Sequence, residues 1–217
     1  MRPEVLTPEA ARLAPRLCAA LAGLPFTLAG GTGLALQLGH RISVDFDWFC
    51  APEAFPRDLA PRLYELDPSL QTLQDKAGTF ECLLGGVKCS FFGFSPQFGP
   101  ATDVLHDLPL APVADIAAMK LIAVSQRGAR KDFYDLHEVL RHMKFRPITQ
   151  RLAEMYSRPS PNPVHLAKSL VYFDDAEADP EPRLLSEVQW VTVRRYFEAH
   201  VHEFTNLLTE AVGTPPA

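Results

Sequence analysis

The sequence predicts an α/β protein of the mixed α+β type, with a small sheet in its first half and a helical second half. Strand-like segments alternate with amphipathic segments over the first 92 residues, whereas only helix-like patterns follow Pro112. The 217 residues are 47% apolar and 22% charged, which is an ordinary globular composition. A chain of this length buries roughly 70% of its unfolded surface, so its core needs neither a disulfide nor a metal.

The first half is expected to alternate helices with strands. Thr7 is a good N-cap and Pro8 suits the first position of a helix. Ser43–Phe49 alternates polar and aromatic residues as a strand does, and Gly85-Gly86 is a two-residue hairpin signal. The expected elements are a helix over 7–21, a strand over 26–29, a helix over 33–38, a strand over 43–49, a helix over 53–65 and strands over 70–73, 79–84 and 87–92.

Helical patterns fill the chain after the proline-containing stretch Pro109–Pro112. Gly128 separates two of the expected helices, because glycine commonly follows a helix C-terminus. The expected helices cover residues 114–127, 130–143, 148–156, 164–170 and 187–208. We therefore expect an α/β core over residues 1–108 and a helical region over residues 109–217.

Charge, cysteine content and hydropathy narrow the class of protein. The formal net charge of −5 argues against a protein that coats nucleic acid without specificity, although it is compatible with a local basic groove. The four cysteines have no C-x-x-C spacing and are expected to be reduced core thiols. No signal segment is visible, and the apolar runs are far shorter than the ~20 residues that cross a bilayer. We expect a cytoplasmic protein without membrane contact.

A diglycine turn is the first candidate for chemistry. Gly30, Gly31 and Thr32 follow the predicted strand at 26–29 and precede the predicted helix at 33–38. Glycines let the backbone approach a ligand closely, and a helix N-terminus offers unpaired N–H groups and a partial positive charge. Thr32 adds a hydroxyl donor. The turn is therefore a candidate phosphate-binding site.

A pair of carboxylates on the next predicted strand is the second candidate. Asp45 and Asp47 are two residues apart, so both project from one face of the strand while Phe46 and Trp48 point into the core. A shared divalent ion, Mg²⁺ or alternatively Mn²⁺, relieves the repulsion between such carboxylates. Taken singly, a Gly-Gly-Thr turn is more often an ordinary loop, and a D-x-D pair is more often solvated surface or a helix cap. In combination they indicate metal-dependent phosphoryl or nucleotidyl transfer.

Three blocks of the sequence form a recognisable pattern. The first is GGTGLALQLGHR at Gly30–Arg41 followed by DFDWF at Asp45–Phe49. The second contains DIAAMK at Asp115–Lys120, then Arg127-Gly128 and KDFYDL at Lys131–Leu136, and the third is SLVYFDDAE at Ser169–Glu177. The pattern resembles DNA polymerase β-like nucleotidyltransferases and, more closely, the AbiEii/AbiGii toxin family. This resemblance spans about residues 28–197.

The resemblance implies the minimal nucleotidyltransferase fold, in which a small mixed sheet is flanked by helices and a helical C-terminal region contributes to the active-site cleft. The implied reaction is attack of an acceptor hydroxyl on the α-phosphate of an NTP, with release of pyrophosphate. The implied acceptor is the tRNA 3′ end, the implied metal is Mg²⁺, and the implied protein partner is a separately encoded antitoxin.

By position, the resemblance also implies roles for individual residues. Gly30–Thr32 would hold the triphosphate, and Asp45 and Asp47 would bind the metal and serve as catalytic residues. Independently of the resemblance, Arg41 lies shortly before the aspartates, where it is placed to contact phosphate or to pair with one of the carboxylates.

Two further roles are implied for the helical half. Lys120 matches a helical lysine that contacts the nucleotide phosphates, and Asp132 matches a late catalytic aspartate. Each has an alternative: Lys120 extends along an apolar helix to the surface, and Asp132 complements the dipole of its helix. Asp135, one turn later, is placed to substitute for Asp132 or to support it.

One departure from the superfamily pattern concerns the third metal-binding carboxylate. Its expected strand is Val87–Phe92, where Ser90 occupies the outward position and Lys88 faces the same side. A nucleotide-binding protein without turnover is therefore one alternative, and nucleotidyl transfer to a protein or a small molecule is another.

Residues 110–160 carry nine Lys/Arg against five Asp/Glu, which suits either an RNA-guiding surface or an ordinary solvated helical face.

Overall fold

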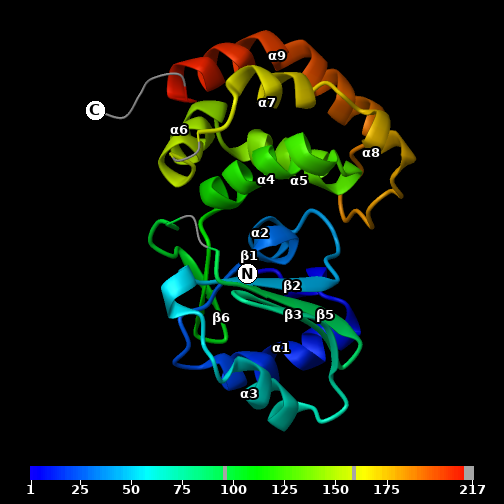
Figure 1. The fold of residues 1–217 in the computed structure, drawn as a ribbon. Helices are drawn as coiled ribbons and strands as arrows, with labels where there is room; N and C mark the ends of the chain where they lie inside the picture. The colour runs from blue at the N-terminus through cyan, green and yellow to red at the C-terminus, as the bar shows by residue number, and fades with distance from the viewer. Residues whose placement is uncertain (95–96, 158–159, 213–217) are drawn as a thin grey trace. The chain divides into compact units, whose positions relative to one another are not determined.

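The computed structural model describes residues 1–94, 97–157 and 160–212, and it divides into two compact units. Unit 1 is Met1–Pro112 and unit 2 is Val113–Ala217. Unit 1 combines a sheet with helices, whereas unit 2 is helical over its described residues (Figure 1). The predicted mixed α/β class is therefore confirmed. The division into functional domains at residues 108 and 109 stays a prediction.

Seven strands form one mixed sheet within the described residues of unit 1. They are β1 (Thr27–Ala29), β2 (Asp45–Phe49), β3 (Gln71–Lys76), β4 (Thr79–Leu84), β5 (Val87–Phe92), β6 (Asp103–Leu105) and β7 (Leu108–Leu110). Their order in the sheet is β3-β4-β5-β2-β1-β7-β6. The pairs β2–β5 and β1–β7 are parallel, and the other pairs are antiparallel.

Helices cover both faces of this sheet. They are α1 (Pro8–Leu21), α2 (Gly30–Leu38) and α3 (Leu59–Leu66), with short 3₁₀ turns η1 (Pro3–Val5) and η2 (Pro52–Ala54). Figure 1 shows α1 and α3 on one face and α2 on the other. Thr7 caps α1 as predicted, since its hydroxyl accepts a hydrogen bond from the Ala10 N–H at 3.2 Å.

Alternation along the strands separates a core face from a polar face. Phe46 and Trp48 of β2 are fully buried, as are Cys89 and Phe91 of β5. Phe46 and Trp48 therefore point into the core, as predicted. All four cysteines of the chain are free and buried, which confirms their prediction as core thiols.

Two predicted helices of unit 1 differ in the structure, and one hairpin was not predicted. The helix predicted at 33–38 begins at Gly30, so the diglycine pair lies in its first turn. The helix predicted at 53–65 is interrupted, because Phe55 precedes Pro56 and takes the extended conformation that a following proline favours. The hairpin of β6 and β7 was not predicted, since its strands have three residues each and β7 contains Pro109.

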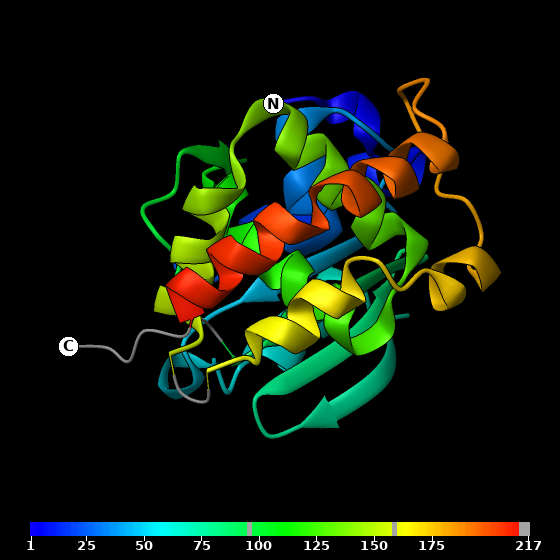
Figure 2. The same cartoon turned by 90° about the horizontal axis from the view of Figure 1, so that it is seen from above.

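Unit 2 is a cluster of helices around an aromatic core. The helices are α4 (Val113–Arg127), α5 (Arg130–His142), α6 (Phe145–Met155), α7 (Pro163–Ser169), α8 (Asp174–Ala178) and α9 (Trp190–Val212). Helix α4 packs against α5, α6 and α7, and α9 runs across α6 and α7 (Figure 2). Phe133 and Phe197 join α5 to α9 with ring centroids 5.6 Å apart. Throughout the described residues, every helix is too short or too polar to cross a membrane.

Candidate active site

The start of α2 brings two polar side chains against its glycines. Gly30 has a positive φ of 62°, which glycine adopts without steric cost. A Cβ on Gly30 would lie 3.0 Å from the Cβ of Asp47 and nearer still to its carboxylate. A Cβ on Gly31 would lie 3.4 Å from Cζ of Arg41 and 3.5 Å from Oγ of Ser43. Both glycines therefore make room for the close approach of charged or polar side chains.

The two carboxylates of β2 occupy defined places beside this turn. Asp45 and Asp47 are half-buried and alternate with core residues, so they share one face of the strand as predicted. Asp47 pairs in register with Ala29, the last residue of β1 before Gly30. This pairing explains why the Asp47 side chain reaches the glycine.

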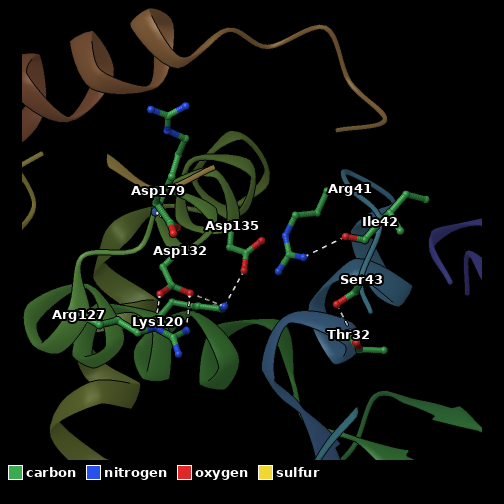
Figure 3. A network of polar contacts seen from close by, with 10 residues as sticks. Thr32, Arg41, Ile42, Ser43, Lys120, Arg127, Asp132, Asp135 and Asp179 are labelled. Atoms are coloured by element: carbon green, nitrogen blue, oxygen red, sulfur yellow. Dashed lines mark hydrogen bonds and ion pairs between the residues drawn. The ribbon is translucent and has the colours of Figure 1, made fainter. Parts of the chain in front are cut away.

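Two hydroxyl groups join the first turn of α2 to the start of β2. The Thr32 hydroxyl lies 2.8 Å from Oγ of Ser43 (Figure 3). It also contacts the main-chain oxygen of Asp45. Thr32 is 1% exposed, so its side chain is directed to β2 in this structure. Ser43 was not among the predicted site residues. Its position two residues before Asp45 was the available signal, because residues at that spacing share a strand face.

Arg41 supplies a buried positive charge at the same place. It is 4% exposed, and its Nη1 donates a hydrogen bond to the Ile42 main-chain oxygen at 3.1 Å (Figure 3). A guanidinium beside Gly31 adds to the partial positive charge of the α2 N-terminus. This combination attracts anions, and the contact of Arg41 with phosphate stays a prediction.

Strand β5 continues the polar face without a carboxylate of its own. Lys88 and Ser90 lie in register with Asp45 and Asp47, so they share the face as predicted. Both contact the carboxylate of Glu81 on β4: Lys88 Nζ lies 2.8 Å from it, and the Ser90 hydroxyl donates to it at 3.1 Å. Glu81 was not predicted as part of the site.

The donor set on β2 fits a divalent ion that arrives with a phosphate ligand. Mg²⁺ prefers carboxylate oxygens and is commonly held by one or two carboxylates together with substrate phosphates. Asp45 and Asp47 supply two such groups, and Gly30 leaves space directly beside the Asp47 carboxylate. In the described part of the chain no three His, Cys, Asp or Glu side chains lie together as a metal site. An ion at Asp45 and Asp47 would thus complete its ligands with water molecules, or with phosphate oxygens when a nucleotide is bound.

Lys120 of α4 is buried between two carboxylates of α5. Its Nζ lies 2.7 Å from Oδ1 of Asp132 and 2.6 Å from Oδ2 of Asp135 (Figure 3). Lys120 is 5% exposed and both aspartates are 0% exposed. Arg127 adds a second cation, with Nε 2.8 Å from Oδ2 of Asp132. The alternative of a lysine extended to the surface is therefore wrong.

The electrostatics of this cluster favour the charged form of Asp132. Burial alone would raise the pKa of Asp132, because a carboxylate is poorly solvated in the interior. The positive charges of Lys120 and Arg127 outweigh burial and lower the pKa of Asp132. Two cations and two carboxylates then compensate one another inside unit 2. Asp135 shares Lys120 with Asp132, and its role as a substitute or a support for Asp132 stays a prediction, as do the parts of Lys120 and Asp132 in the reaction.

Many basic residues of the segment 110–160 contact groups of their own unit. Arg151 forms a two-point contact with the buried Asp115, at 2.6 and 3.0 Å. Besides the contacts of Lys120 and Arg127, Arg130 contacts the main-chain oxygens of Ala176 and Glu177, Arg141 contacts Glu138, and Arg146 contacts Glu210. These charges therefore have structural roles, and their contact with RNA stays a prediction.

Comparison with known sequences relates the chain to a protein family and to one relative. The model of the family described as nucleotidyl transferase AbiEii toxin, type IV TA system, matches residues 12–81 and 92–210. An uncharacterized protein of Aquifex aeolicus (strain VF5) is 35% identical over 184 residues, which cover 82% of this chain and 87% of the relative.

Two solved structures resemble the chain along most of its length. MenT4, the nucleotidyltransferase toxin Rv2826c from Mycobacterium tuberculosis H37Rv, has a TM-score of 0.57 and 18% identity, over 94% of this chain and 93% of its own. JHP933 from Helicobacter pylori has a TM-score of 0.56 and 19% identity, over 94% and 95%. At this level of identity the likeness shows a shared fold.

Proposed function

The chain belongs to the AbiEii family of nucleotidyl transferase toxins of type IV toxin–antitoxin systems and is a nucleotidyltransferase; from this premise we propose that it transfers an NMP from an NTP to the tRNA 3′ end in a Mg²⁺-dependent reaction. The observation that carries the proposal is the Asp47 carboxylate packed against Gly30 at the start of α2. It joins a carboxylate pair to the turn that we propose to bind phosphate, within one unit.

The proposed reaction exchanges one phosphorus–oxygen bond for another. The acceptor hydroxyl oxygen forms a bond to the α-phosphorus, its proton is released, and the bond between the α-phosphorus and the β-phosphate oxygen breaks to release pyrophosphate. The first N–H groups of α2 have no partner within the helix and point towards a bound phosphate. Gly30 and Gly31 let that phosphate approach, and Arg41 adds a fixed positive charge for the triphosphate.

Asp45 and Asp47 would hold the divalent ion, for which Mn²⁺ is an alternative to Mg²⁺. When bound, the ion would neutralise charge on the phosphate oxygens and the leaving pyrophosphate. Support for this assignment comes from the shared strand face of the carboxylates and from the space beside Gly30. The register of β1 and β2 keeps that arrangement in place.

For Lys120 and Asp132 we propose the roles that the family resemblance implies. Lys120 would contact the nucleotide phosphates, and Asp132 would assist deprotonation of the acceptor or metal binding. These roles require an ammonium and a carboxylate, and the ion pairs of Lys120 with Asp132 and Asp135 favour those charged forms. Thr32 would contribute its main-chain N–H, since its hydroxyl is directed to β2.

Family membership also supports a partner and a location. A toxin of a type IV system is matched by a separately encoded antitoxin, and we propose such a protein as the partner of this chain. We further propose a cytoplasmic location, where NTP and tRNA are both available.

The position of the label in an NTP tests the proposed reaction. The protein is incubated with Mg²⁺, total tRNA and each of the four NTPs, labelled either at the α- or at the γ-phosphate. Transfer of the α-label to RNA and release of the γ-label as pyrophosphate is the expected result. Transfer of the γ-label would contradict nucleotidyl transfer, and α-label in protein or in a small molecule would contradict the tRNA acceptor. NTP binding without transfer would support the alternative of a protein without turnover.

A further inference from the structure

The sheet face of Asp45 and Asp47 extends across two more strands. Ser90 lies opposite Asp47 on β5, and Glu81 lies opposite Ser90 on β4. Lys88 lies opposite Asp45, two residues before Ser90. Residues paired in this way on adjacent strands project from the same face with about 5 Å between them. The carboxylate pair therefore has a neutral neighbour and a cationic neighbour on β5.

Glu81 fixes both of these neighbours. One of its oxygens, Oε1, lies 2.8 Å from Lys88 Nζ and accepts the Ser90 hydroxyl at 3.1 Å. The Glu81 side chain is 20% exposed and that of Lys88 is 46% exposed, so the ion pair joins a partly buried carboxylate to a lysine at the edge of the solvent. The hydrogen bond that the Lys88 ammonium donates to Glu81 raises the pKa of Lys88, and the negative charges of Asp47 and Asp45 raise it further. Glu81 thus holds the Lys88 ammonium in place, and the carboxylates of β2 attract it electrostatically.

We propose that Lys88, positioned by Glu81, is the fixed cation of the carboxylate site and that the site consequently binds a single divalent ion. This inference rests on the proposed function, because it requires a metal at Asp45 and Asp47. It makes Lys88 a determinant of metal number and Glu81 a positioning residue.

Charge is the first argument for a single ion. A carboxylate in place of Ser90 would add a negative charge beside Asp47 and favour a second cation. Instead, Ser90 is neutral and Lys88 contributes a positive charge to the same face. On the sheet face itself, Asp45, Asp47 and Glu81 together with Lys88 carry a net charge of −2, which one divalent ion neutralises. The buried Arg41 beside Gly31 adds a further positive charge, which also disfavours a second ion.

The second argument for a single ion is that the Glu81 carboxylate is already bound by other side chains. Lys88 and Ser90 both engage its carboxylate, and the described residues contain no arrangement in which Glu81 joins Asp45 and Asp47 as a third metal ligand. Glu81 therefore acts on the site through Lys88 rather than through a metal.

Mn²⁺ binding, followed by the EPR signal of the free ion, tests this inference on the whole chain without nucleotide. We expect one Mn²⁺ per wild-type chain. Lys88→Met should bind Mn²⁺ at least about fivefold more tightly, because it removes a positive charge about 7 Å from a divalent ion in a nearly aqueous dielectric. Lys88→Arg retains the charge and should keep the wild-type affinity. Lys88→Met combined with Ser90→Asp should bind a second ion.

Two controls separate the inference from its premise. Arg12→Met removes one exposed positive charge from α1, on the opposite face of the sheet, and should leave the affinity unchanged. Asp45→Asn should abolish Mn²⁺ binding. Binding that survives Asp45→Asn, or absence of binding in the wild type, contradicts the proposed function. Two ions in the wild type, or an unchanged affinity of Lys88→Met when Asp45→Asn does abolish binding, overturns the role of Lys88 alone.

Discussion

Replacement of Gly30 by alanine tests whether the diglycine turn and Asp47 act as one site. Two costs are expected. The first is conformational, since an alanine at a φ of 62° is disfavoured by about 1–2 kcal/mol. The second is steric, since the new Cβ would lie 3.0 Å from Asp47 Cβ and nearer still to the carboxylate. Ordinary contact distances of about 3.5 Å or more then require the carboxylate to move by about 1 Å.

Gly85→Ala is the matched control, because it carries the conformational cost without the steric one. Gly85 has a φ of 56°, and a Cβ there would meet no atom within 4 Å. We expect Gly85→Ala to lower the free energy of unfolding by about 1 kcal/mol and Gly30→Ala to lower it by about 2–3 kcal/mol, since Asp47 also leaves its rotamer. Transfer activity should fall roughly 100-fold in Gly30→Ala, as for a 1 Å misplacement of a catalytic group, and should be unchanged in Gly85→Ala.

Urea unfolding and the labelled-NTP transfer assay measure these two quantities on the same preparations. If the turn and Asp47 form one site, activity falls much further in Gly30→Ala than in Gly85→Ala. Wild-type transfer by Gly30→Ala, or an equal loss in both variants, would refute it.

Other predictions concern the interior of the two units. Lys120→Met should lower the free energy of unfolding by about 3–5 kcal/mol, because Asp132 and Asp135 stay buried without it; a loss below about 1 kcal/mol in urea would contradict this. The pKa of Asp132 is lower in the folded than in the unfolded protein, where it is about 3.9. Ionised Asp132 therefore stabilises the fold above about pH 3.9, and this stabilisation is lost as the pH falls through the folded pKa. The melting-temperature deficit of Asp132→Asn at pH 7 should therefore shrink below about pH 4, and a deficit that is constant with pH would count against the ion pairs. Burial raises the pKa of the thiols, so native protein at pH 8 should resist iodoacetamide until urea is added, and mass spectrometry should show no early alkylation of Cys18, Cys50, Cys82 or Cys89.

The polar face of the sheet was largely predictable because strand alternation and hairpin geometry are local. Asp45 and Asp47 had to share a face once Phe46 and Trp48 were assigned to the core. The two-residue turn Gly85-Gly86, with φ of 56° and 80°, sets Leu84 opposite Val87 and hence Glu81 opposite Ser90. The position of Glu81 was therefore contained in the hairpin signal, although its contacts with β5 were not deduced.

Other features depend on contacts between distant segments and carry little local signal. The β6–β7 hairpin turns at His106 and Asp107, two non-glycine residues with positive φ, so the usual glycine signal is missing. The sequence also left the partner of Lys120 undecided, because a lysine on an apolar helix either extends to the surface or binds a buried anion. Asp132 and Asp135 lie one helical turn apart on α5, a spacing that places both on one face. Only the packing of α4 against α5 decides that they bind Lys120.

The claim that Asp45 and Asp47 bind the metal next to the nucleotide is tested most directly by locating the bound ion. Crystals of the protein grown with Mn²⁺ and a non-hydrolysable NTP analogue allow the ion to be located by its anomalous scattering. The account predicts a peak in contact with the carboxylates of both Asp45 and Asp47, with the triphosphate at the first turn of α2 beside Gly30. A nucleotide bound elsewhere, or a manganese peak that avoids both carboxylates, would contradict it.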